Sequence, residues 1–439
     1  MLKKLAAIIG LLCFVGNLCA DSLLPSDLVY QGAFRVPDGT FGTKTNWSGT
    51  PIETFAYSDC VAAYDPAANT LYLTGHIYGQ LVAAVSIPTP VKTTIGNSAA
   101  LPAAAITQPF RDITAGIVMA DGTKFPIGFG TGIYQILGMC VDGSRLYWSA
   151  GRYYVVDGTS TASQGLSTLL STAHQAWGPW YVDVAPEQKI ARQIIKVPQA
   201  WADQYVGGRR LLAGRYTLQG IASTSSGPTL YAYQEPAANL PAKDSVLSGK
   251  SVTHWDNWQA PYPGHLIPDD YHSAVWIDTG VKSAVLFVGR KAGASYYGEP
   301  RPGDCEQYKG YHGDPYEPRV WFFDPAALGS AAQNNTPESP RAYATWKPAE
   351  FWPQCSGYLK GSAYDSARKL LYIVQPYAYK GAGNDYYPIV HVYKVGPDIV
   401  VPPPSVAVPL QIVVTVEVTG QDGKPVPATG VKVTKVEVK

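Results

Sequence analysis

Short segments of small residues return five times along the chain, and a turn and an aliphatic, tyrosine-rich strand follow each of them. The copies are spaced irregularly, by 53 to 88 residues, and contain strand patterns rather than helical ones. Self-similarity of this kind is typical of the blades of a β-propeller. The copies begin at Cys60, Leu137, Gln219, His272 and Lys360 and lead to Leu71–Leu73, Leu146–Trp148, Leu230–Ala232, Leu286–Val288 and Leu371–Ile373.

We therefore expect an all-β chain with a propeller over residues 21–396. Five blades over residues 25–396 have about 74 residues each, against a usual ~40–50, so six or seven blades remain open alternatives. An isolated N-terminal strand, Leu28–Val36, is predicted to pair into the last blade, because a closed ring leaves no open sheet edge. A helix between Ala185 and Tyr205 is suggested but interrupted by Pro198. Two long loops, 104–135 and 290–318, are predicted to be functional or disordered.

The first 20 residues have the pattern of a secretory signal. Lys3 and Lys4 precede an apolar run, and small residues end at Ala20. The run is too short to span a membrane. Cys19 suggests a lipid anchor, but Leu18 stands where a small residue is expected, which argues against lipidation. The mature protein is expected to be secreted, periplasmic or at the cell surface.

The pattern changes after Gly396. Residues 397–410 form a proline-rich linker, and residues 411–439 alternate valine with polar residues around a Gly-Gln-Asp-Gly turn, which predicts a β-hairpin. A lone hairpin is marginally stable in water, so we expect this tail to add its strands to another copy or to a cell-surface partner. The competing prediction is that the tail folds back onto its own last blade.

Composition adds few constraints. The 439 residues carry a formal charge of +1 and only 15% charged residues, which gives no field to recruit nucleic acid. Four cysteines remain after the signal segment. We expect a disulfide between Cys305 and Cys355, which lie in adjoining blades of an exported chain. Cys60 and Cys140 are predicted either to be buried thiols or to form a second bridge.

Two parts of the chain resemble known groups. The segments Leu28–Pro37, Tyr308–His312, Trp321–Pro325 and Gly361–Asp365 resemble uncharacterised exported bacterial propeller proteins. This resemblance implies a secreted propeller and no particular activity. The tail, with its Val-Thr-Val-Glu-Val-Thr-Gly-Gln-Asp-Gly-Lys-Pro phrase, resembles the first hairpin of a bacterial Ig-like surface module.

Candidate chemistry follows from aligning the repeats. If their first strands line a central channel, polar side chains at their N-terminal ends meet at one mouth. Such a mixed cluster can bind a small polar ligand or hold acid–base groups, or it can hold water and satisfy strand ends. The ligand-binding candidates are Gln219, His272, Lys360, Tyr271 and Tyr358, and the candidate catalytic carboxylates are Asp59, Asp269 and Asp270.

Two further groups of residues have open interpretations. Asp304, Glu306, Asp314 and Glu317 form an acidic loop that either holds calcium or is a solvated loop pinned by the disulfide. No other cofactor is expected. The tryptophans Trp177, Trp180, Trp255 and Trp258 either stack on sugars or partners, or pack between blades.

Three functions are compatible with these patterns. The first is an exported binding or assembly module. The second is a carbohydrate-active enzyme, of glycosidase or lyase type, with carboxylates at the channel mouth. The third is a structural subunit of an extracellular polymer. A glycosidase requires two carboxyl groups about 5–5.5 Å or about 6.5–9.5 Å apart in an open pocket, whereas a binding module does not.

Overall fold

The chain divides into two compact units, Met1–Gly396 and Pro397–Lys439. A computed structural model describes residues 21–46, 48–118, 134–152, 160–184, 190–215, 225–255, 257, 259–305, 310–381 and 385–396, all of them in the first unit. The signal segment 1–20, the linker 397–410 and the tail 411–439 lie outside the described residues, so these assignments stay predictions.

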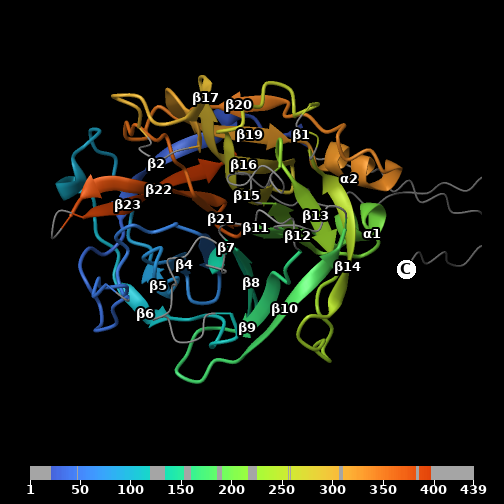
Figure 1. Cartoon of the computed structure of the whole chain (residues 1–439), viewed down its shortest axis with the longest axis horizontal. Helices are drawn as coiled ribbons and strands as arrows, with labels where there is room; N and C mark the ends of the chain where they lie inside the picture. Colours follow the sequence, from blue (N-terminus) through green and yellow to red (C-terminus); the bar gives the residue numbers. More distant parts are fainter. Residues whose placement is uncertain are drawn as a thin grey trace, which may run out of the picture. The chain divides into compact units, whose positions relative to one another are not determined.

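The described strands form five antiparallel groups that follow one another along the chain (Figure 1). Group 1 contains β3 (Ala62–Asp65), β4 (Thr70–Thr74), β5 (Val82–Ser86) and β6 (Ile106–Arg111). Group 2 contains β7 (Tyr134–Asp142), β8 (Arg145–Arg152), β9 (Gln164–Thr168) and β10 (Ala176–Asp183). Group 3 contains β11 (Ile190–Lys196), β12 (Leu211–Arg215), β13 (Leu230–Tyr233) and β14 (Val246–Thr253).

The last two groups carry additions from elsewhere in the chain. Group 4 contains β15 (Asp270–Asp278), β16 (Lys282–Ala292), β19 (Tyr316–Phe323) and β20 (Ala344–Trp346), and β1 (Asp21–Ser22) runs parallel to β16. Group 5 contains β21 (Gly361–Asp365), β22 (Leu370–Lys380), β23 (Tyr386–Val395) and the N-terminal β2 (Leu28–Arg35). The all-β class is confirmed.

The remaining elements are short and peripheral to these groups. A separate hairpin, β17 (Ser295–Gly298) with β18 (Gly310–Gly313), interrupts group 4. The helices are α1 (Gln199–Tyr205), α2 (Pro325–Asn334) and the 3₁₀ turns η1 (Pro25–Asp27) and η2 (Ser98–Ala100). Groups 2 and 3 are joined through parallel pairing of β10 with β14, which makes one continuous sheet of eight strands.

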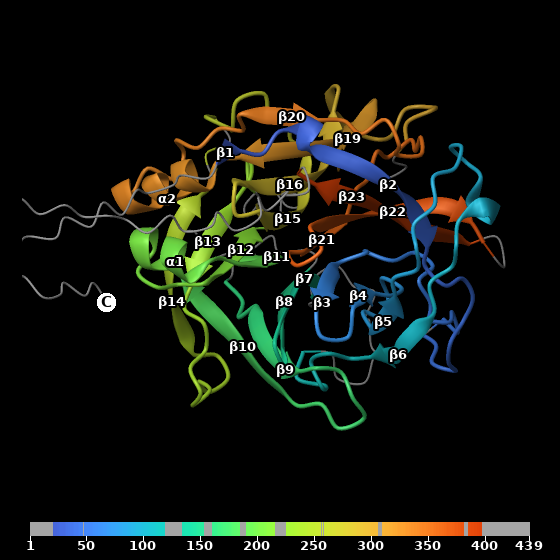
Figure 2. The ribbon, with the colours of Figure 1, turned by 180° about the vertical axis from the view of Figure 1, so that it is seen from behind.

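The first strands of the five groups form a closed ring of contacts. β3 contacts β7, β7 contacts β11, β11 contacts β15, β15 contacts β21, and β21 contacts β3 again. Figures 1 and 2 show these strands around the centre of the first unit, with β6, β10, β14 and β20 at its edge. The ring places the N-terminal ends of five strands from distant parts of the sequence together.

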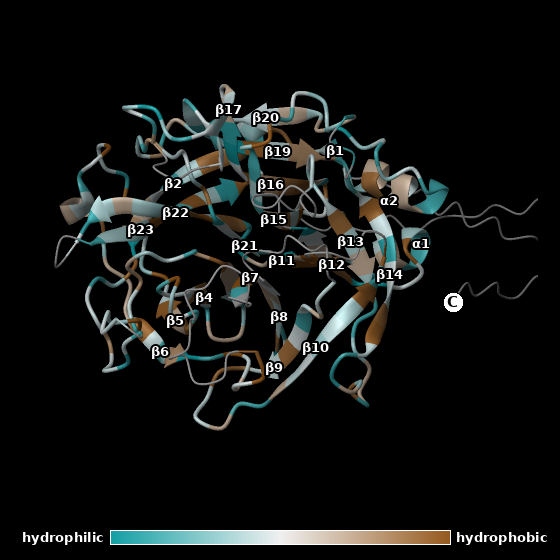
Figure 3. Ribbon diagram, viewed as in Figure 1, coloured by the Kyte–Doolittle hydropathy of each residue, from teal (hydrophilic) through white to brown (hydrophobic). Residues whose placement is uncertain are grey.

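Strand periodicity explains how the groups pack. Successive side chains of a strand point to opposite faces, so one strand serves two neighbours. In β16, Leu286 and Val288 pack toward group 5, whereas Val285 and Phe287 pack toward group 3. Among the described residues, the same alternation places a large apolar cluster between each pair of neighbouring groups. Figure 3 shows the matching pattern of hydrophobic strands and more polar loops.

The N-terminal strand completes the last group, as predicted. β2 pairs antiparallel with β23, from Leu28 opposite Val395 to Arg35 opposite Ile389. A β-bulge lies between Tyr30 and Gly32, and the neighbouring Ala33 also bridges to Val91 of the loop after β5. A strand near the start of the first unit, β2, therefore covers the edge of β23, the last strand described in this unit.

Two expectations about local structure were wrong. The repeat phrase leading to Leu230 was aligned with the other copies, but β13 is the third strand of its group, whereas the matching strands elsewhere are second strands. The first strand of group 3 is β11, whose sequence lacks the small residues that begin the other copies of the repeat. Residues 190–196 of the suggested helix are this strand, and α1 begins only after Pro198.

Candidate functional site

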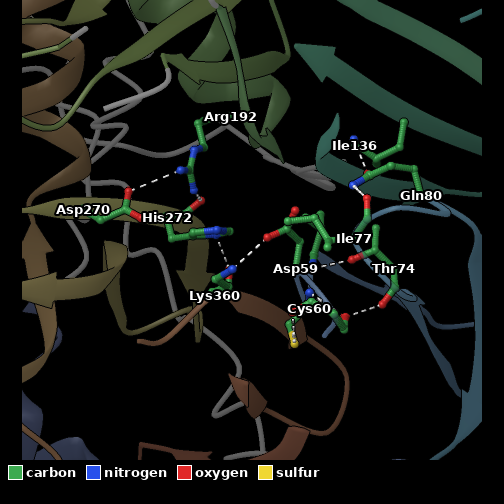
Figure 4. A network of polar contacts seen from close by, with 12 residues as sticks. Asp59, Cys60, Thr74, Ile77, Gln80, Ile136, Arg192, Asp270, His272 and Lys360 are labelled. Carbon is green, nitrogen blue, oxygen red and sulfur yellow. Dashed lines mark hydrogen bonds and ion pairs between the residues drawn. The ribbon is translucent and has the colours of Figure 1, made fainter. Parts of the chain in front are cut away.

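Four of the predicted site residues meet at the N-terminal ends of the first strands (Figure 4). Lys360 Nζ donates to Asp59 Oδ1 at 2.7 Å, and His272 Nδ1 lies 2.9 Å from the backbone oxygen of Lys360. Arg192 NH2 lies 3.4 Å from Asp270 Oδ1, and its NH1 donates to the backbone oxygen of His272. We call Asp59, Arg192, Asp270, His272 and Lys360 the mouth network. It links groups 3, 4, 5 and 1.

The Asp59–Lys360 pair is the most buried charge contact between the first and last groups. Their side chains are 7% and 9% exposed. Burial lowers the pKa of Lys360, but the adjacent Asp59 carboxylate has the opposite effect, and the net result is a pKa above the usual value for lysine. The ammonium group therefore stays charged. Asp59 Oδ2 is buried and has no hydrogen-bond partner. Buried polar atoms are almost always paired, so this oxygen marks a point where a donor is expected.

His272 is fixed as a neutral imidazole. Burial lowers its pKa well below the usual range, and the nearby charges of Arg192 and Lys360 lower it further. Because a carbonyl oxygen can only accept, Nδ1 carries the proton and donates to Lys360 O. The other ring nitrogen, Nε2, therefore carries a lone pair and can accept a hydrogen bond.

Aromatic rings connect the buried pair to the surface. The Tyr377 ring centroid lies 5.6 Å from Lys360 Nζ and 6.0 Å from the ring of Tyr57, which is 51% exposed. Tyr57 also contacts His76, whose ring lies 5.4 Å from that of the exposed Tyr78. We call Tyr57, His76, Tyr78 and Tyr377 the tyrosine rim.

The backbone of this region is strained. Tyr57 and Tyr377 both have φ near 52°, and Cys60 has φ 57°. Gln80, which accepts from the backbone of Ile136 next to the network, has φ 50°. Bulky residues rarely adopt left-handed backbone, and such strain concentrates at functional sites. The strain therefore favours a functional interpretation of the rim.

Two other predicted residues belong to the packing of group 4. Asp269 is fully buried, accepts from the backbone nitrogens of Leu266 and Ala292, and lies 3.0 Å from Lys291 Nζ. Burial raises the pKa of Asp269. Tyr271 packs in the apolar cluster between groups 3 and 4, with its ring 4.6 Å from that of Trp321. We do not include either residue in the site.

Tyr358 supports the mouth from the side. The Tyr358 ring lies 3.9 Å from the Arg290 guanidinium and 5.0 Å from Lys360 Nζ. The Arg290 guanidinium also lies 3.8 Å from the Tyr316 ring. Gln219, the remaining candidate, lies outside the described residues. The alignment that selected Gln219 was out of register, and Arg192 is the residue that group 3 contributes.

The charge partners of the carboxyl groups in the described part of the mouth bear on the glycosidase alternative. Asp59 and Asp270 each contact a cation, and the carboxyl group with a raised pKa, Asp269, is fully buried. A glycosidase needs a protonated acid and a carboxylate that both reach the substrate. The described residues instead offer hydrogen-bond acceptors and aromatic faces.

The predicted disulfide is confirmed. Cys305 and Cys355 are bonded, with Cα atoms 5.2 Å apart. Cys60 and Cys140 are free, and burial raises the pKa of both thiols to about 12. Cys60 is buried and Cys140 half-buried, so they correspond to the first alternative and not to a second bridge.

The acidic loop is paired with cations. Asp304 contacts Arg301 at 3.1 Å and His312 at 3.1 Å, and Asp314 lies 3.5 Å from Arg301. Glu317 pairs with Arg319 and Lys347, and Glu306 lies outside the described residues. Within the described ranges, no three histidine, cysteine, aspartate or glutamate side chains are arranged to hold a metal ion.

The tryptophan candidates divide in favour of packing. Trp180 and Trp255 are 1% and 4% exposed and lie in apolar clusters, and Trp180 Nε1 donates to the backbone oxygen of Ala242. Trp177 is half-buried in β10, and Trp258 lies outside the described residues. Among the helices described, none is long and apolar enough to cross a membrane.

Comparison with known proteins gives no family. No family model and no curated protein matches the sequence. Among solved structures, the chain is similar to a luciferin-regenerating enzyme, with 10% identity, a TM-score of 0.32, and coverage of 79% of this chain and 92% of that one. It is also similar to the endosialidase of phage phi92, with 10% identity, a TM-score of 0.34, and coverage of 93% and 76%. Neither similarity supports a function for this chain.

Proposed function

We propose that the chain is an exported five-bladed β-propeller that binds a carbohydrate at the mouth of its central channel. The five strand groups are its blades, and β2 closes the ring. The observation that carries the proposed site is the unpartnered Asp59 Oδ2, which is connected through Lys360 and Tyr377 to the exposed ring of Tyr57.

The chemistry of the mouth suits a sugar. Sugars present hydroxyl donors along one edge and apolar C–H faces. Asp59 Oδ2 and His272 Nε2 are buried acceptors that a sugar hydroxyl would reach through a bridging water, and the Tyr57 and Tyr78 side chains are exposed. The strained, mutually contacting rim is held in place before a ligand arrives, which lowers the cost of ordering it on binding.

The ion pairs of the mouth network favour binding of a sugar over its hydrolysis. Each carboxylate of the mouth network contacts a cation, so neither is set up as a proton donor. The C-terminal residues 411–439 remain a proposed attachment segment, which would place the binding propeller on another copy or on a cell-surface partner.

The test is a glycan microarray screen of the full chain, followed by calorimetric titration of the best glycan. Replacing Tyr57 or Tyr78 with alanine should weaken binding about tenfold, because an aromatic contact contributes about 1.4 kcal/mol. The matched control is Tyr297→Ala, which removes an exposed ring from the separate β17–β18 hairpin and should leave the affinity unchanged.

Two outcomes would contradict the proposal. One is that no glycan binds. The other is that a glycan binds equally well to the wild-type chain and to both rim variants. Asp59→Asn supplies a second probe, and its thermal unfolding should be measured alongside its affinity because Lys360 loses its charge partner.

A further inference from the structure

A second candidate site lies inside the channel. A cavity of about 380 Å³ is lined by residues from the first strands of all five groups. Its walls begin at Ala62, Ala274 and Ser362, each two residues beyond a residue of the mouth region, and continue toward the C-terminal ends of the same strands. The cavity is therefore distinct from the tyrosine rim and the mouth network. Its volume falls in the range of small-molecule sites, about 300–1,000 Å³.

The sequence keeps this space open. Protein interiors are close-packed, so a cavity of this size needs small side chains on its walls. Alanine and serine supply them on β3, β15 and β21. Three larger rings, those of Tyr64, Trp276 and Tyr364, also line the cavity. Trp276 is held edge-on against Trp201 at 5.2 Å, and the Tyr364 hydroxyl donates to the backbone oxygen of Asp278.

The lining also includes a guanidinium group that is poorly neutralised. Arg210 NH1 lies 4.0 Å from Glu235, and Arg210 Nε is buried without a hydrogen-bond partner. Glu235 is shared, because Arg145 and Lys196 lie 3.8 and 3.7 Å from it and Tyr147 donates to it at 2.6 Å.

Lys196, the other cation of the lining, has a partner of its own. It pairs with Asp142. This cluster therefore has two carboxylates, Asp142 and Glu235, for the three cations Arg145, Lys196 and Arg210. Arg210 is the cation with the weakest contact. Guanidinium groups are always charged and match the planar geometry of a carboxylate, to which they form two parallel hydrogen bonds.

We propose that the channel cavity binds a small aromatic carboxylate. The ring of the ligand occupies the space between Tyr64, Trp276 and Tyr364, and its carboxylate pairs with Arg210. Aromatic rings favour offset or edge-on neighbours, which the fixed rings of the walls provide. This site uses none of the residues of the proposed carbohydrate site.

The experiment uses ligand-observed NMR titration of the full chain with 4-fluorophenylacetate and, as the neutral counterpart, 2-(4-fluorophenyl)ethanol. We expect saturable binding of the acid and at least about tenfold weaker binding of the alcohol, since an ionic hydrogen-bonded contact contributes about this much. Arg210→Gln should lower the affinity for the acid to that for the alcohol, and Arg210→Lys should restore part of it.

The matched control is Arg209→Gln, which removes the neighbouring guanidinium that bonds to Ser248 instead. It should leave the affinity for the acid unchanged. The proposal is overturned if the wild-type chain shows no saturable binding of the acid, if acid and alcohol bind equally, or if Arg210→Gln binds the acid as the wild type does. Loss of glycan binding at the mouth would not affect any of these outcomes.

Discussion

Burial changes what the mouth residues do for stability. Exposed polar side chains typically contribute within about 0.5 kcal/mol to stability. The two ligand-binding candidates His272 and Lys360 are instead only 3% and 7% exposed. Both side chains also connect neighbouring groups through hydrogen bonds. We therefore expect that replacing Lys360 changes the stability of the fold.

Lys360→Ala should lower the free energy of unfolding by about 3–5 kcal/mol, because it leaves the buried Asp59 carboxylate without its cation. Urea denaturation measures this change. The matched control is Lys347→Ala, whose side chain is 58% exposed and pairs with Glu317 at the surface. It should cost less than about 1 kcal/mol. Equal losses for the two variants would show that the buried pair has no special role.

Buried histidines give the fold a defined pH dependence. Burial lowers the pKa of His391 from 6.5 to about 3, and that of His265 likewise to about 3. Between pH 6.5 and about pH 3, these two histidines bind protons in the unfolded chain but not in the folded chain. Stability is therefore fully present above pH 6.5 and falls as the pH drops, by about 1.4 kcal/mol per pH unit for each such histidine.

His391→Gln should reduce this slope by about one proton, measured by urea denaturation between pH 4 and 6.5. Tyr30→Phe is the control, since it removes a hydroxyl partner of the His391 ring but keeps the titrating group. An unchanged slope in His391→Gln would mean that this imidazole is protonated in the folded chain.

At the scale of the strand, the closing element β2 is fixed by a glycine. Gly32 has φ 123°, and a Cβ there would lie 2.5 Å from the backbone carbon of Val91. Gly32→Ala should therefore cost about 3 kcal/mol, through strain and a clash with main chain. Gly39→Ala is the matched control, because Gly39 has φ 105° but nothing within 4 Å of its Cβ position, and should cost about 1 kcal/mol. Similar unfolding midpoints for both variants would count against a close approach of the loop to β2.

The strands could be predicted where their sequences repeat. Leu71–Leu73 and Leu371–Ile373 are continuous runs of aliphatic and tyrosine residues, as expected of strands buried on both faces, and β2 and the disulfide followed from an exported, closed ring. Group 3 could not be aligned, because in its first strand, β11, Arg192 is followed by Gln193, Ile194 and Ile195, where the other first strands carry mostly small residues. The tyrosine rim was also missed, since Tyr57 lies in a turn and Tyr377 at an irregularity of β22, and left-handed backbone at a tyrosine has no sequence signal.

At the scale of the whole molecule, the predicted tail determines whether the propeller acts alone. If residues 411–439 add strands to another copy, deleting residues 405–439 should reduce the number of copies per particle, measured by light scattering. The described unit closes its own ring through β2 and β23, so the shortened chain should still fold. An unchanged number of copies together with unchanged retention at the cell surface would contradict the proposed attachment role.

The most direct test of the proposed function is a crystal structure of the full chain with the glycan that binds best. We expect five blades and a sugar ring stacked on Tyr57 or Tyr78, with a hydroxyl group bonded to Asp59 through a bridging water. A glycan bound elsewhere on the propeller, with the tyrosine rim unoccupied, would contradict it.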